Sequence, residues 1–91
     1  MAEVVLDGLE IRSVEEVHDR FAQALDLPDY YGRNLDALFD CLTDRRETMT
    51  VRLLHREALE DRLGRRGAAM VRLLRRAAEE NPAVTLLEAE N

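Results

Sequence analysis

Two aspartates one helical turn apart, Asp36 and Asp40, are the residues of this sequence whose spacing most suggests chemistry. Carboxylates four residues apart lie on one face of a helix and repel each other by about 0.2–0.5 kcal/mol. The helix dipole favours Asp36 in the first turn but disfavours Asp40 near the C-terminal end. Because folding alone would not select this pair, we interpret it as an outward face that binds a cationic group.

The same side chains could instead serve an enzyme. Asp36 and Asp40 could act as paired acid and base, and His18 and His55 could join acids as metal ligands. Two carboxylates one turn apart, without a glycine-rich loop, a paired histidine or a second acidic cluster, make a poor catalytic site. Cys41 lies beside an apolar stripe and is expected to pack as a small hydrophobic residue. The sequence thus favours a binding protein, with no catalytic residue, no metal and no cofactor.

Aromatic side chains flank the two aspartates. Phe39 projects off the apolar stripe of the same helix, and Tyr30 and Tyr31 stand in the loop that leads into it. Aromatic residues that exclude water around charged pairs are typical of interface hot spots. The simpler alternative is a solvated acidic helix face with tyrosine or phenylalanine packed in an ordinary core.

Apolar periodicity and turn signals place these residues in a small α/β domain. A Ser13/Glu16 capping box and a capping residue at Asn34 mark two helix starts, and Pro28 with Gly32 breaks the chain between them. The predicted strands are residues 3–6, 49–54 and 84–87, and the predicted helices are 14–25, 34–43, 56–63 and 67–80. Strands separated by helices favour a parallel sheet. We expect one domain, 1–91, with three parallel strands and about four helices.

Charge is distributed unevenly along the chain. The formal net charge is −6, which disfavours nucleic acid and anionic membranes as partners. Up to Asp44 eleven acids face three bases, whereas 45–78 holds ten arginines and four acids. The plain alternative is that the two halves attract each other and keep the monomer soluble. With one cysteine and no signal-like start, we expect a cytoplasmic protein without an intramolecular disulfide.

An arginine-rich surface offers a rival function. The arginines near the end of the basic stretch could make the last helix a nucleic-acid or membrane surface. Net acidity argues against this, and neighbouring glutamates could pair with the arginines on an exposed face. The arginines concerned are Arg65, Arg66, Arg72, Arg75 and Arg76.

One segment carries a family resemblance. Residues 27–43, Leu-Pro-Asp-Tyr-Tyr-Gly-Arg-Asn-Leu-Asp-Ala-Leu-Phe-Asp-Cys-Leu-Thr, closely resemble the signature of the barstar family, intracellular inhibitors of the ribonuclease barnase. Asp7-Gly8 and 11–13 (Ile-Arg-Ser) stand at matching places, and the order of strands and helices extends the resemblance over most of the chain. It implies a three-stranded parallel sheet with four helices, and a secreted, guanyl-specific microbial ribonuclease as the partner.

The resemblance also implies roles for individual residues. On the matching positions Asp40 would enter the phosphate-binding pocket of the ribonuclease, Asp36 would pair with a basic residue at its rim, and Tyr30 would pack on the catalytic histidine. The acids would thus imitate RNA phosphates. The expected partner-binding residues are Tyr30, Tyr31, Gly32, Asn34, Asp36, Ala37, Phe39, Asp40, Thr43, Asp44, Arg45 and Arg76.

Several positions depart from the family pattern. Arg45 replaces an aromatic residue after the acidic helix, and the bulky aromatic inside the signature is Phe39. Arg76 aligns with a glutamate that adds an acidic contact, although Glu79 and Glu80 are close enough to substitute. The target could therefore be a related ribonuclease, or the chain could be an antidote or binding module for another cationic protein.

Overall fold

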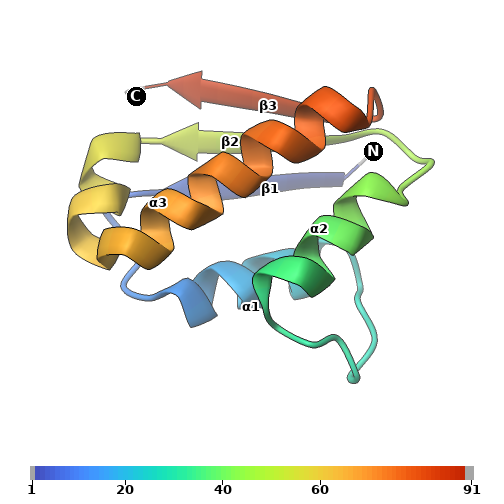
Figure 1. Ribbon diagram of the computed structural model, residues 1–91, viewed down its shortest axis with the longest axis horizontal. Helices are drawn as coiled ribbons and strands as arrows, with labels where there is room; N and C mark the ends of the chain where they lie inside the picture. The colour runs from blue at the N-terminus through green and yellow to red at the C-terminus, as the bar shows by residue number, and fades with distance from the viewer. Residues whose placement is uncertain (1, 90–91) are drawn as a thin grey trace.

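The computed structural model describes residues 2–89, which form a sheet of three parallel strands with three helices packed against it (Figure 1). The elements follow in the order β1 (Ala2–Asp7), α1 (Val14–Ala24), α2 (Leu35–Thr43), β2 (Met49–Leu54), α3 (Arg56–Glu80) and β3 (Val84–Ala89). The predicted α/β class and parallel pairing are confirmed. The second strand has the predicted bounds, and the other two extend beyond them.

The central strand of the sheet is β2. It pairs with β1 on one side, where Val4 aligns with Val51, and with β3 on the other, where Val51 aligns with Leu86. Alternate side chains of the strands are buried, including Val4 and Val51, whereas the intervening positions, such as Val5 and Leu87, are exposed. Because a strand points successive side chains to opposite faces, the helices cover one face of the sheet and leave the other open to solvent.

The predicted starts of the first helix and of the acidic helix are both confirmed. Ser13 caps α1, and its hydroxyl accepts the N–H of Glu16 at 3.1 Å. Asn34 caps α2, and its Oδ1 accepts the N–H of Ala37 at 2.8 Å. Such caps satisfy donors that the helix itself leaves without an acceptor. They set where α1 and α2 begin.

The two predicted helices at the end of the chain form a single element, α3, so the expectation of about four helices is corrected to three. Gly64, which directly follows the predicted helix 56–63, adopts φ 66° and ψ −140°, and the helix resumes directly after it. Glycine tolerates this positive φ because it lacks a Cβ. Two helical segments of α3 therefore meet at a kink at Gly64, with no loop between them.

The core lies between the sheet and the three helices. Its largest fully buried apolar side chains come from every element except β3 and from the loop after β1, and they are Leu6, Ile11, Val17, Phe21, Leu38, Leu42, Met49, Leu53, Leu59, Met70 and Leu74. Leu38 and Leu42, the apolar stripe predicted for the acidic helix, are fully buried. Within residues 2–89 no helix is long and apolar enough to cross a membrane.

Candidate partner-binding site

Five aspartates lie in the loop 25–34, in helix α2 and at its C-cap. None of the five forms an ion pair with another residue of the described range 2–89, whereas many acids elsewhere do, including Glu3, Glu15 and Glu88. The unpaired acids are Asp26, Asp29, Asp36, Asp40 and Asp44. The folded domain therefore leaves this segment with uncompensated negative charge.

Three of these acids form one stripe along α2. Asp36, Asp40 and Asp44 follow each other at a spacing of four and are all exposed, and we name them the acid stripe. Asp44 is the C-cap, and its N–H donates to the carbonyl of Asp40 at 3.0 Å. Since Leu38 and Leu42 occupy the buried side, the packing of α2 turns the stripe outward. The predicted common face of Asp36 and Asp40 is confirmed.

The aromatic residues near the stripe separate into three environments. Tyr30 is 87% exposed, which is unusual for so large an apolar ring. Phe39 is half-buried, and the guanidinium carbon of Arg76 lies 4.9 Å from its ring centroid, within the range of a cation–π contact. Tyr31, also expected at the partner surface, is buried in the core instead.

Tyr31 attaches the loop to the core. Its hydroxyl lies 2.6 Å from Nδ1 of His18, a residue of α1 that is only 2% exposed. Burial raises the pKa of Tyr31 to about 12. Burial also lowers the pKa of His18. Both groups are therefore neutral near pH 7, and a hydrogen bond between them links the loop to the first helix.

The turn into α2 is held by local contacts. Arg33 has φ 52°, and its guanidinium pairs with Asp19 of α1. Asn34 Nδ2 donates to the carbonyl of Gly32 at 3.2 Å. A Cβ on Gly32 would lie 2.9 Å from that Nδ2 atom and 3.3 Å from the Cβ of Ala37. A side chain at position 32 would therefore crowd the capping amide of Asn34, which glycine avoids.

The C-terminal end of α2 is fastened by a residue that the sequence analysis did not identify. Asn81, the C-cap of α3, is 8% exposed, and its Nδ2 donates to the carbonyls of Leu42 at 2.8 Å and Arg45 at 2.9 Å. Thr43 Oγ1 donates to the carbonyl of Phe39 at 2.8 Å. In the sequence Asn81 stood out only as part of a helix-ending Asn-Pro pair. Nothing in the sequence around Asn81 indicates that its side chain hydrogen-bonds to the end of α2.

Two arginines border the acidic surface. Arg76 reaches Glu80 at 3.3 Å and, with Arg72, lines a groove of about 300 Å³ that also contains Asp36 and Phe39. Arg45 extends toward Glu47 at 3.9 Å, and its Nε is buried without a hydrogen-bond partner in the described part of the chain. The acid stripe is thus flanked by positive charge on α3 and just after its own C-terminus.

The arginines of α3 are largely engaged within the domain. Arg66 pairs with Glu15 at 2.7 Å, and Arg75 pairs with Glu88 at the same distance. Together with the pair formed by Arg76, these contacts place a carboxylate beside each of three arginines and so reduce the net positive charge that this face offers to a nucleic acid. They match the expected alternative of a salt-bridged exposed face.

The residues considered for catalysis lie apart. His18 is engaged by Tyr31, and Nδ1 of His55 lies 3.0 Å from Asp7 at the opposite end of the fold. Among the described residues no group of three or more His, Cys, Asp and Glu side chains could hold a metal ion. Burial, with the charges of Asp40 and Asp44, raises the pKa of the Cys41 thiol, which therefore stays protonated.

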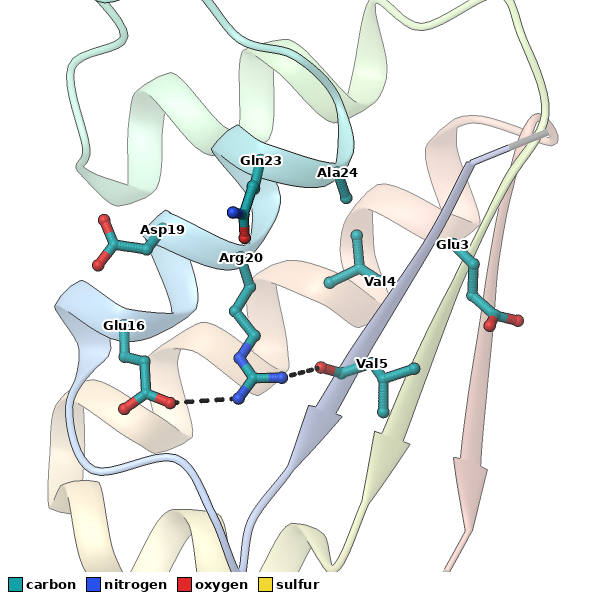
Figure 2. A pocket seen from close by; sticks show the side chains of 8 residues that line it. All are labelled: Glu3, Val4, Val5, Glu16, Asp19, Arg20, Gln23 and Ala24. Atoms are coloured by element: carbon teal, nitrogen blue, oxygen red, sulfur yellow. Dashed lines mark hydrogen bonds and ion pairs between the residues drawn. The ribbon is translucent and has the colours of Figure 1, made fainter.

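A separate open groove of about 480 Å³ lies between β1 and α1, as Figure 2 shows. Arg20 spans it, donating to the carbonyl of Val5 at 3.3 Å and pairing with Glu16 at 3.4 Å. Because β1 is an edge strand, this arginine occupies an acceptor that another strand could use. The groove is well separated in sequence from the acid stripe, and the side chain of Arg20 helps to protect the sheet edge.

The structure thus combines a three-stranded parallel sheet with an acid stripe that α2 exposes to solvent. A sequence model of the family described as "Barstar (barnase inhibitor)" matches residues 1–88. The chain therefore belongs to the barstar family, as the resemblance of 27–43 predicted.

A curated relative supports this assignment over a shorter range. The Bacillus subtilis (strain 168) protein named "Putative ribonuclease inhibitor YrdF" is 54% identical over 43 residues. The alignment covers 47% of this chain and 47% of that protein, so the match spans about half of each.

Proposed function

We propose that this protein is an inhibitor of an extracellular, guanyl-specific microbial ribonuclease, and that the acid stripe and the preceding loop fill the active site of that enzyme. Membership of the barstar family and the name of the B. subtilis relative support ribonuclease inhibition in general. The observation that carries the proposal for this chain is the acid stripe itself, whose three carboxylates face solvent without an ion-pair partner in residues 2–89.

The chemistry of the target explains why carboxylates would block it. A ribonuclease must attract the phosphates of RNA with arginine, lysine or histidine, and such a pocket also attracts a carboxylate. In this proposal Asp40 occupies the phosphate pocket, Asp36 pairs with a base at its rim, and the exposed ring of Tyr30 packs on the catalytic histidine. Opposite charge on the two proteins would also speed their encounter.

Rigidity supports inhibition as strongly as charge does. The Asn34 cap holds the start of α2, the hydrogen bond between Tyr31 and His18 holds the loop, and Asn81 holds the end of the helix. A carboxylate that is already fixed loses little conformational freedom when a partner binds. We also propose that the protein is not itself an enzyme and that it protects RNA in the cytoplasm of the producing cell.

The test is a titration of the protein into RNA-cleavage assays with a panel of guanyl-specific microbial ribonucleases at low and high salt. We expect stoichiometric inhibition of at least one enzyme, weakened by salt because opposite charges attract across the interface. The variant Asp40→Asn keeps the shape of the side chain and should abolish or greatly weaken inhibition. Asp61→Asn, an exposed acid on α3, is the matched control and should inhibit as the parent does.

Failure of every ribonuclease in the panel would contradict the proposal. The second candidate, an antidote for another cationic protein, is favoured by Arg45 and Arg76, which place positive charge where the family pattern has an aromatic residue and an acid. It would then be tested by whether an identified basic protein binds the parent but not Asp40→Asn. A loss of binding in the Asp61→Asn control would show that net charge, and not the acid stripe, drives association.

A further inference from the structure

A cavity of about 320 Å³ lies at the N-terminal end of α2, between α1, the loop before α2 and the second part of α3. Its polar lining consists of hydrogen-bond donors and charged groups from three elements, on a floor of small apolar side chains. These polar residues are His18, Arg33, Asn34, Arg65 and Arg66. In a protein with a net charge of −6, three arginines around one cavity are a notable local excess.

The buried histidine supplies an unpaired donor at this cavity. The Tyr31 hydroxyl keeps its proton at neutral pH, and within residues 2–89 its one hydrogen-bond partner is Nδ1 of His18. We assign the hydroxyl as the donor to Nδ1, because it has no other hydrogen-bond partner among the described residues; the neutral imidazole then carries its own proton on Nε2. His18 is 2% exposed and lines the cavity, yet its Nε2 has no partner among the described residues.

The arginines keep donors free for a ligand. Arg33 pairs with Asp19, Arg66 pairs with Glu15 at 2.7 Å, and Arg65 has no ion pair within the described range. Each of these two ion pairs uses one terminal nitrogen, while a guanidinium carries five N–H donors. The three arginines therefore face two carboxylates, Asp19 and Glu15. The cavity keeps a net positive charge and unused N–H donors.

We propose that this cavity binds a phosphate group, either as inorganic phosphate or as part of a small phosphomonoester. A tetrahedral oxyanion presents several acceptors at once, which suits a set of donors from arginines and a protonated imidazole nitrogen. The N-terminus of α2 lies beside the cavity and adds a favourable partial charge. A bound phosphate would join α1, the loop and α3 through His18, Arg33 and Arg65.

This site uses none of the three carboxylates of the acid stripe, so it can fail or hold independently of the proposed ribonuclease inhibition. The two surfaces share only Asn34, whose Oδ1 caps α2 and whose Nδ2 donates to Gly32. Phosphate binding would stabilise the folded loop by mass action, because the unfolded chain has no such cavity.

The experiment follows the ¹⁵N resonance of His18 Nε2 in the full chain during titration at pH 7 and constant ionic strength. The probes are inorganic phosphate and a ribonucleoside 5′-monophosphate, with chloride as the reference anion. We expect a saturable shift of this resonance and a rise in melting temperature with either probe or both. Arg65→Gln should raise the Kd at least fivefold.

Arg46→Gln is the matched control, because Arg46 is exposed, lies outside the cavity and forms no ion pair in residues 2–89. It should bind both probes as the parent does. Tighter binding of the nucleotide would identify a phosphomonoester site, and equal binding would identify a site for the free ion. The proposal is overturned if neither probe gives a saturable shift, or if Arg65→Gln and Arg46→Gln change the Kd equally.

Discussion

The outward face of α2 carries unpaired negative charge, whereas the N-terminal end of α2 lies beside arginines that are mostly ion-paired. On the outward face the acid stripe exposes three carboxylates that no cation within residues 2–89 neutralises. At the N-terminal end, Arg33 and Arg66 are each paired with an acid of α1. Ion pairs between exposed groups contribute little to stability, so pairing mainly sets how much charge a surface offers to a partner. The comparison predicts that the stripe governs partner affinity and that its supports govern stability.

The largest expected effect is on partner affinity. Asp40→Ala should weaken binding to the target ribonuclease by about 2–5 kcal/mol, because a basic pocket of the enzyme would be left without its counter-charge. The free energy of unfolding should stay nearly unchanged or rise slightly, since the variant removes repulsion along the stripe. Inhibition assays and urea unfolding measure the two quantities. Unchanged affinity would remove Asp40 from the site.

The next effect is on stability, through Asn81, which holds the C-terminal end of α2. Asn81→Ala should lower the free energy of unfolding by about 1–3 kcal/mol, because the carbonyls of Leu42 and Arg45 would lose a buried donor. Urea unfolding gives the stability. Glu79→Ala, an exposed neighbour in the last turn of α3, is the control and should be nearly neutral. A neutral Asn81→Ala would mean that packing alone holds this end of α2.

A smaller effect is a dependence of stability on pH through His18. Burial lowers the pKa of His18 in the folded state, so the unfolded chain binds the proton more readily. This contribution is fully present above the ordinary histidine pKa of about 6.5 and is lost as the pH falls below it toward the lower folded pKa. Urea unfolding between pH 5 and 8 should show this loss. The slope should diminish in His18→Gln but persist in His55→Gln.

The smallest expected effect is on the rate of association with the partner. Arg76→Gln removes a positive charge beside the acid stripe, and should raise the rate of association with a cationic ribonuclease about two- to fivefold at low salt. Stability should change by less than about 1 kcal/mol, because Arg76 and Glu80 are both exposed. Stopped-flow association at two salt concentrations tests this. A slower association would indicate that Arg76 meets an acid on the partner.

Local patterns in the sequence were sufficient for much of the fold and for the position of the acid stripe. The spacing of Leu38 and Leu42 determined which side of α2 is buried, and hence that Asp36 and Asp40 face outward. The caps at Ser13 and Asn34 set the helix starts. The helices predicted at 56–63 and 67–80 are the two parts of α3, but the kink at Gly64 that joins them was not predicted.

The sequence by itself determined the helix starts, the buried side of α2 and the spacing of its acids. These features depend on neighbours a few residues away, because helix caps, apolar periodicity and the spacing of charges act over one or two turns. The tertiary structure alone decided that Tyr31 turns inward to His18 while Tyr30 stays exposed, and that Asn81 reaches α2 across 39 residues of sequence. It also brought Arg33, Arg65 and Arg66 to one cavity. These contacts join segments distant in the chain, and a side chain selects such a partner only when packing of the core has set the distance between them.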